Sequence, residues 1–284
     1  MIPSAFEYHR PGDVSSAVGL LQKYGDEARV IAGGHSLIPM MKLRMADIGH
    51  LVDLQNVEEL KGISVSGNSV TIGAMVTQAE LIAHGGLANA VPLLREAALQ
   101  IADPQVRYVG TVGGNVANGD PGNDMPGLMQ CLNATFTLVG PDGSREVAAR
   151  DFYQSAYVTD RADDEILTRI AFNAVSGGYA YEKQKRKIGD YATAAAAVLL
   201  TRAGEKVVTA SIAMTNLSDT PVWSEASGGA LVGTDCGHDA VMAAVAAMLN
   251  DIDPQQDNRG PIEFKRHVAG VILARAIARA WARA

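Results

Sequence analysis

Two glycine-rich segments are the parts of this sequence most suited to holding a large anion. The first is Ala32-Gly33-Gly34-His35-Ser36, directly after a short apolar run. Paired glycines let backbone N–H groups approach phosphate oxygens, a following helix adds partial positive charge, and Ser36 offers a hydroxyl. The spacings GxGxxG and GxxxxGK[ST] are absent from the segment. A phosphate cradle and a simple strand-to-helix turn therefore remain alternatives here.

The second segment, residues 110–127, contains six glycines together with several small hydrogen-bonding side chains. Dense glycine beside small amides suits backbone contact to a diphosphate, and a carboxylate such as Asp124 suits sugar hydroxyls. The order of residues in Asp120–Asp124 lacks the alternating ligands and closing glutamate of a calcium loop. The alternative is an elaborate loop without a ligand. The uncharged candidates for ligand contact are Thr111, Asn115, Asn118 and Asn123.

The two segments make sense together if both contact one elongated dinucleotide. A flat aromatic ring at one end of that ligand would need apolar and polar walls. The candidates for these walls are Ile101, Ala102, Val109, Leu167 and Tyr191.

Composition narrows the classes of function. The 284 residues carry a net charge of −7, which disfavours nucleic-acid binding, and no apolar run reaches the roughly 18 residues of a membrane helix. The first residues lack a basic region followed by an apolar stretch, which predicts a cytoplasmic protein without a secretory signal. Cys131 and Cys236 belong to no CxxC or Cys/His cluster, so zinc and iron–sulfur sites are not expected. Redox chemistry would need a cofactor without thiolate ligands.

Periodicity and turn residues predict the elements that position the two segments. A helix over 14–24 capped by Asp13, a strand over 28–32, a helix over 37–45 and a strand over 50–54 form a first unit ending near Val57. For the next part of the chain we predict a strand over 69–75 and helices over 77–84 and 92–101, followed by an irregular segment over 102–126. A helix over 128–133 and strands over 134–139 and 165–171, around a turn at 141–143, complete this part. After a boundary near 174–178 we expect strands over 179–187, 193–201 and 207–215, then helices over 238–249 and 261–284. The alanine run 194–197 is equally compatible with a helix.

Two groups of basic residues keep alternative interpretations. The run Lys183, Lys185, Arg186 and Lys187 is either a solvated strand face or a docking or ligand-edge surface. Arg275, Arg279 and Arg283 recur every four residues on the last helix and predict a solvated face, with contact to a partner subunit or an acidic membrane surface as the alternative. Cys131, inside an apolar helical stretch, is expected to be buried.

Three strings of residues resemble a known family. They are AGGHSLIPMMKLR, IADPQVRYVGTVGGNVANGDPGNDMP and YEKQKRKIGDYATAAAA. They are similar to the FAD-binding medium subunits of molybdenum hydroxylases, and the similarity extends over nearly the whole chain. The second and third strings favour the carbon monoxide dehydrogenase subgroup more narrowly, although related dehydrogenases share much of them.

The resemblance implies an α+β fold. Two α/β subdomains of the vanillyl-alcohol-oxidase type, residues 1–57 and 58–175, would enclose FAD. A smaller C-terminal α+β domain, an antiparallel sheet plus helices, would follow over residues 176–284.

The resemblance also implies which residues contact FAD. Residues 32–36 and 111–115 would hold the pyrophosphate, Lys185 would lie near a polar flavin edge and Tyr191 would stack on the ring. FAD would be non-covalent, which leaves His35 as a turn residue. The full predicted set is Ala32, Gly33, Gly34, His35, Ser36, Leu37, Ile101, Ala102, Val109, Thr111, Gly113, Gly114, Asn115, Asn118, Asp124, Leu167, Lys185 and Tyr191, with no residue that acts on the substrate and no metal ligand.

The function implied is electron transfer. The chain would accept electrons from a small subunit with two iron–sulfur clusters, beside a molybdopterin large subunit that oxidises carbon monoxide, and pass them to an external acceptor, a quinone. The complex would be a dimer of heterotrimers, either free in the cytoplasm or held at the inner face of the membrane by its partners. The alternatives are the same subunit of an aldehyde, purine or N-heterocycle dehydrogenase, a stand-alone flavin oxidoreductase, or a non-catalytic nucleotide-binding module.

Overall fold

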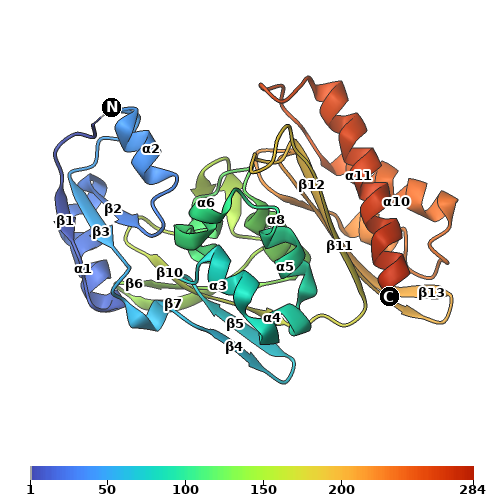
Figure 1. Ribbon diagram of the computed structural model, residues 1–284, viewed down its shortest axis with the longest axis horizontal. Coiled ribbons are helices and arrows are strands. Elements are labelled where there is room, and N and C mark those ends of the chain that lie inside the picture. Colours follow the sequence, from blue (N-terminus) through green and yellow to red (C-terminus); the bar gives the residue numbers. More distant parts are fainter. Residues whose placement is uncertain (1) are drawn as a thin grey trace.

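The computed structural model describes residues 2–284, and three larger sheets follow one another along the chain (Figure 1). A separate two-stranded sheet pairs β8 (Tyr153–Ser155) with β9 (Val158–Thr159). The first of the larger sheets is parallel, with the order β1-β3-β2, and is covered by α1, whose cap Asp13 accepts a hydrogen bond from the Ser16 N–H at 2.7 Å. Its buried side chains include Val18 and Leu21 of the predicted helix, so the first unit of the prediction is confirmed. The elements are β1 (Glu7–His9), α1 (Val14–Tyr24), η1 (Gly25–Glu27), β2 (Ala28–Ile31), α2 (Leu37–Lys42), β3 (His50–Asp53) and η2 (Glu58–Leu60).

The second sheet is antiparallel, with the order β4-β5-β10-β6-β7, and its core face packs against helices. The turn near Pro141 joins β6 to β7, whereas the prediction placed it between β6 and β10; β10 pairs with the other edge of β6. Strands β4 and β7 were missed because they are mostly solvent-exposed and lack an apolar run. The elements are β4 (Ile63–Ser66), β5 (Ser69–Gly73), α3 (Gln78–Ala83), α4 (Gly85–Ala90), α5 (Pro92–Ala98), β6 (Thr135–Gly140), β7 (Gly143–Ala148), β8 (Tyr153–Ser155), β9 (Val158–Thr159) and β10 (Ile166–Asn173).

The segment 102–126, predicted to be irregular, contains helices, and that prediction was wrong. They are α6 (Pro104–Val109), α7 (Val112–Ala117) and the start of α8 (Asp124–Cys131). Asp103 caps α6 by accepting from the Val106 N–H at 2.9 Å, and Thr111 caps α7 by accepting from the Gly114 N–H at 3.0 Å. Two glycines among the six residues of α7 lower its intrinsic helix propensity and conceal it from sequence patterns.

The third sheet, β11-β12-β13-β14, is antiparallel and packs between two cores. Along β12, Ala195 and Ala197 face the core of the second sheet, whereas Ala194 and Ala196 face α10 and α11. Burial on both faces explains why the alanine run shows no alternation and is nevertheless a strand. The elements are β11 (Gly178–Gln184), β12 (Ala194–Ala203), β13 (Lys206–Thr215), β14 (Val222–Trp223), α9 (Glu225–Gly229), α10 (His238–Asp251) and α11 (Ile262–Arg283).

The α+β class and the C-terminal antiparallel sheet with helices are confirmed. The predicted divisions after residues 57 and 175 fall in the segments between successive sheets, and that they separate independent domains stays a prediction. In residues 2–284, no helix combines the length and apolar character that a bilayer crossing requires.

The arginine stripe of α11 is not simply a solvated face. Arg279 and Arg283 form ion pairs with Glu96 of α5, at 3.1 and 2.7 Å, and Arg279 also pairs with Glu182 of β11. Arg275 is exposed. Two of the three arginines therefore tie the last helix to the middle of the molecule, where α11 lies across the outer face of β11 and β12 (Figure 1).

Cys131 is buried, as expected. Its S–H lies 3.3 Å from the Ser211 carbonyl oxygen, and burial raises the pKa of its thiol to about 12. A thiol with this pKa stays protonated at neutral pH, so Cys131 serves as a small core side chain.

Candidate functional site

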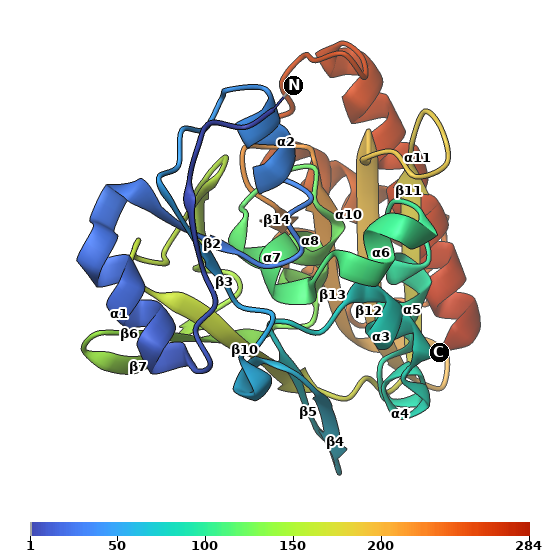
Figure 2. The same cartoon turned by 60° about the vertical axis from the view of Figure 1, so that its left-hand side comes forward.

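A cavity of about 520 Å³ opens where the three larger sheets meet, within the size range of cofactor pockets. Its walls come from the loop between β2 and α2, from α7 and the start of α8, from β10, and from the third sheet through Lys183 and residues 189–191. Turning the molecule brings the β2–α2 loop forward, beside α7 (Figure 2). The two glycine-rich segments thus meet at one cavity.

The two segments approach each other so closely that Gly33 cannot carry a side chain. A Cβ at Gly33 would lie 2.5 Å from the Val109 carbonyl oxygen and 2.8 Å from the Gly110 Cα. Gly34 has a φ of +71°, which glycine adopts without strain. The pair Gly33-Gly34 is therefore required both for a close contact between loops and for the turn itself.

The first loop offers a run of consecutive free backbone donors. Among residues 2–284, the N–H groups of residues 33–36 have no hydrogen-bond acceptor, and a run of free N–H groups is suited to binding an anion. In α7, by contrast, the Val112 N–H donates to the Val76 carbonyl at 2.8 Å and the Gly113 N–H to the Ala74 carbonyl at 2.9 Å. At Val112 and Gly113 the second segment therefore has no free backbone amide for a ligand.

Two amide side chains at the cavity have buried polar atoms without hydrogen-bond partners within residues 2–284. Both amide atoms of Gln78, which is 2% exposed, are unpaired, and so is Nδ2 of Asn118. Buried polar groups are nearly always hydrogen-bonded, so unpaired ones that line a cavity fit a polar ligand. The donor set and the glycine cradle therefore suit FAD, whose diphosphate, sugar hydroxyls and ring edges all need such partners.

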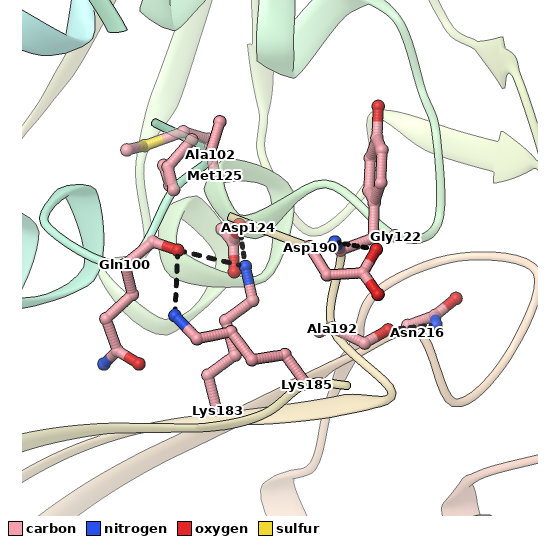
Figure 3. Close-up of polar contacts among 12 residues, drawn as sticks. Gln100, Ala102, Gly122, Asp124, Met125, Lys183, Lys185, Asp190, Ala192 and Asn216 are labelled. Carbon is pink, nitrogen blue, oxygen red and sulfur yellow. Dashed lines mark hydrogen bonds and ion pairs between the residues drawn. The ribbon is translucent and has the colours of Figure 1, made fainter. Parts of the chain in front are cut away.

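A buried ion pair forms the polar wall at the third sheet (Figure 3). The Lys183 ammonium donates to Asp124 Oδ2 at 2.8 Å, and the Tyr181 hydroxyl donates to Asp124 Oδ1. The Lys183 and Asp124 side chains are 1% and 6% exposed. Burial, together with the Asp124 carboxylate, raises the pKa of Tyr181 well above its usual value, so the phenol remains a hydrogen-bond donor.

The lysine that lines the cavity is Lys183, whereas the predicted lysine was Lys185. Lys183 lies in β11 and Lys185 comes directly after Gln184, the last residue of that strand; both ammonium groups approach the Gln100 carbonyl oxygen (Figure 3). The Lys185 side chain does not line the cavity. Its pKa is lowered mainly by burial and, to a smaller extent, by the neighbouring Lys183 charge. Sequence alone cannot decide which of two lysines, separated by one residue, reaches the cavity.

Val109 is the other predicted residue that does not line the cavity. Its side chain is 45% exposed, and only its carbonyl faces Gly33. Tyr191 does line the cavity, where burial is the main cause of its raised pKa.

The remaining predicted residues are brought together along the cavity. They are Ala32, Gly33, Gly34, His35, Ser36, Leu37, Ile101, Ala102, Thr111, Gly113, Gly114, Asn115, Asn118, Asp124, Leu167 and Tyr191. Asn123, a candidate of the second segment outside the predicted FAD set, also lines the cavity, and the polar lining residues that were not predicted include Gln78, Arg161 and Lys183. For Lys183 the basic run was the available signal; Gln78 follows the helix cap Thr77 with no pattern of its own.

Comparison with known families covers almost the whole chain. The family described as "FAD binding domain in molybdopterin dehydrogenase" matches residues 4–172, and the family described as "CO dehydrogenase flavoprotein C-terminal domain" matches residues 179–280.

Individual proteins and structures match over similar lengths. The chain is 56% identical to the carbon monoxide dehydrogenase medium chain of Afipia carboxidovorans, over 100% of this chain and 99% of that protein. It is 33% identical to the glyceraldehyde dehydrogenase medium chain of Sulfolobus acidocaldarius, over 97% and 98%. A chain in a structure of reconstituted CO dehydrogenase from Oligotropha carboxidovorans superposes with a TM-score of 0.98, 56% identity and full coverage of both chains. A chain of quinoline 2-oxidoreductase from Pseudomonas putida 86 gives a TM-score of 0.95 at 32% identity, covering 99% of each chain.

Proposed function

This chain belongs to the family of FAD-binding subunits of molybdopterin dehydrogenases, and on that premise we propose that it is the FAD-binding medium subunit of a carbon monoxide dehydrogenase. The observation that supports FAD binding most is the single cavity where two glycine loops meet beside the unpaired Gln78 amide. Full-length identity of 56% to one such medium chain supports the carbon monoxide assignment over its relatives.

In this proposal the chain binds and orients the cofactor. The N–H groups of residues 33–36 hold the diphosphate, and Leu167 supplies an apolar wall. The Gln78 amide donates to and accepts from polar atoms of FAD, and the Asn118 amide donates to them. Tyr191 faces the ring, and the pair of Lys183 and Asp124 keeps a positive charge fixed at the polar wall. When bound, FAD supplies a redox centre that takes up electrons singly and releases them in pairs. A fixed ammonium favours added negative charge nearby.

The partners proposed are those of the resembled subgroup. A molybdopterin large subunit oxidises carbon monoxide, and a small subunit with two iron–sulfur clusters delivers electrons to this chain, which passes them to a quinone. The proposed assembly is a dimer of heterotrimers in the cytoplasm, with peripheral contact to the inner membrane face made through the partners.

The full chain is expected to bind FAD without a covalent bond. Mixing with FAD and removing excess by gel filtration should leave one flavin per chain by absorbance. After acid precipitation the yellow colour should appear in the supernatant, with the same result for a His35→Gln variant. Colour that stays in the wild-type pellet but not in the His35→Gln pellet would contradict non-covalent binding, and no flavin absorbance at all would contradict FAD binding.

The substrate assignment is tested on the native complex isolated through a tag on this chain. We expect the complex to reduce a dye with electrons from carbon monoxide, and to reduce a soluble quinone analogue with electrons that leave through the FAD of this chain. Dye reduction by a purine, an aldehyde or an N-heterocycle, with none by carbon monoxide, would instead support another molybdenum hydroxylase. A complex that reduces the dye but not the quinone analogue would contradict the proposal that a quinone is the electron acceptor.

A further inference from the structure

The parallel pairing of β1 with β3 gathers two histidines and a glutamate at the end of the first sheet. Glu7 and His9 alternate along β1 and therefore point to the same face, and Glu7 lies opposite His50 in the register of the two strands. Alone among residues 2–284, these three form a group of potential metal-ligating side chains whose ligand atoms all lie within 4.8 Å of one another. His9 and His50 are 41 positions apart, so the sequence does not reveal the group.

The separations of the three ligand atoms fit a single small ion. His9 Nε2 lies 3.0 Å from His50 Nδ1, Glu7 Oε2 lies 3.5 Å from His50 Nδ1, and Glu7 Oε2 lies 3.8 Å from His9 Nε2. A tetrahedral ion with bonds of about 2.0–2.1 Å separates its ligand atoms by roughly 3.3–3.4 Å. The three distances bracket that value, so small side-chain adjustments would complete the geometry.

The surroundings of His50 resemble those of a metal-bound imidazole. The Tyr24 ring stacks on it with centroids 3.6 Å apart and planes at 14°, which fixes the orientation of the ring. With Nδ1 turned to the cluster, the proton belongs on Nε2, and Nε2 faces Glu27 Oε2 at 3.9 Å. Metal-bound histidines commonly direct their second nitrogen to a carboxylate, which raises the basicity of the ligand.

Charge and access also favour a cation. The carboxylates of Glu7 and Glu27 flank the imidazoles, and the nearby Lys23 ammonium is turned to the Tyr24 hydroxyl at 2.9 Å. The side chain of Glu7 is 70% exposed, which leaves a path for an ion from solvent and room for water as a further ligand. Two imidazoles with one carboxylate match the preference of Zn²⁺ rather than that of Ca²⁺ or Mg²⁺, which favour oxygen ligands.

We propose that Glu7, His9 and His50 bind one Zn²⁺ ion, with Glu27 as a positioning residue that acts through His50. The site lies on the first sheet and is built from residues that do not line the FAD cavity. Its failure and the failure of the FAD proposal are therefore distinguishable, since flavin content and zinc content are measured separately.

The test uses the full chain without a histidine tag, stripped with EDTA and then dialysed against Zn²⁺. Elemental analysis should give one zinc per chain, and titration calorimetry should show one saturable site. His9→Gln and His50→Gln should lose this stoichiometric ion. The matched control His267→Gln, which removes an exposed histidine on α11, should keep it.

Two further variants separate an effect on zinc binding from an effect on folding. Glu7→Gln removes an exposed charge and should fold normally, which circular dichroism and flavin content check, yet bind zinc more weakly. Glu27→Gln should weaken binding about 10-fold through loss of the second carboxylate. A wild-type chain that takes up no zinc, or a folded His50→Gln chain that binds zinc as tightly as wild type, would overturn the proposal. Equal affinities of Glu27→Gln and wild type would overturn the role of Glu27.

Discussion

Replacing Lys183 by methionine is expected to lower the free energy of unfolding by about 3–5 kcal/mol, because the Asp124 carboxylate would stay buried without its counter-charge. Asp124 is 6% exposed, and its other side-chain partner is the Tyr181 hydroxyl, which cannot supply a positive charge. Urea unfolding followed by circular dichroism measures the loss. Flavin retention should fall as well, since Lys183 lines the cavity.

The neighbouring lysine provides the control for this experiment. Lys185→Met removes an ammonium just two residues further along the chain, but that ammonium contacts the Gln100 carbonyl at 3.4 Å and, within residues 2–284, no carboxylate. Lys185→Met should therefore lower the free energy of unfolding far less than Lys183→Met does. Combining Lys183→Met with Asp124→Asn should restore part of the stability, because no charge then remains buried. Equal losses for the two single lysine variants would refute the importance of the buried pair.

A valine in place of Gly33 is expected to weaken FAD retention about 10- to 100-fold while leaving the chain folded. The new Cβ would lie 2.5 Å from the Val109 carbonyl oxygen, so the two loops must separate. Such overpacking costs about 1–3 kcal/mol, and each 1.4 kcal/mol corresponds to a tenfold change in affinity. Quenching of flavin fluorescence measures the dissociation constant.

Gly12→Val is the matched control, because a Cβ at Gly12 meets no atom within 4 Å. Its FAD affinity should equal that of the wild type. Gly113→Val should behave differently from both, since its Cβ would lie 2.5 Å from the Ala74 Cβ in the buried core and should destabilise the fold itself. Unchanged flavin affinity in Gly33→Val would mean that the loop contact does not shape the site.

The parts of the fold that sequence predicted well are those whose signals are local. The unit of β2, the Gly33-Gly34 turn and α2 depends on an apolar run, a glycine pair and a helical period that follow one another directly. Helix α7 depends on distant partners instead, because its first N–H groups donate to the carbonyls of Val76 and Ala74. No local pattern records such contacts, and its two glycines argue against a helix.

The candidate site divides in the same way. The glycine loops and the small amides were recognisable by composition, whereas the choice between Lys183 and Lys185 depends on which ammonium meets Asp124 across 59 positions of sequence. Gln78 is identified as a site residue only because its amide is buried without a partner. Sequence thus indicated what the cavity would bind, and tertiary packing determined which polar residues complete it.

The ion pair of Lys183 and Asp124 at the cavity wall restricts which C-terminal halves of related proteins can replace that of this chain. Asp124 lies in the segment that matches the FAD-binding family, and Lys183 lies in the segment that matches the C-terminal family. A chimera that joins residues 1–175 of this chain to the C-terminal half of a relative must therefore supply a lysine at the matching strand position. Without that lysine, the chimera would bury the Asp124 carboxylate with no counter-charge.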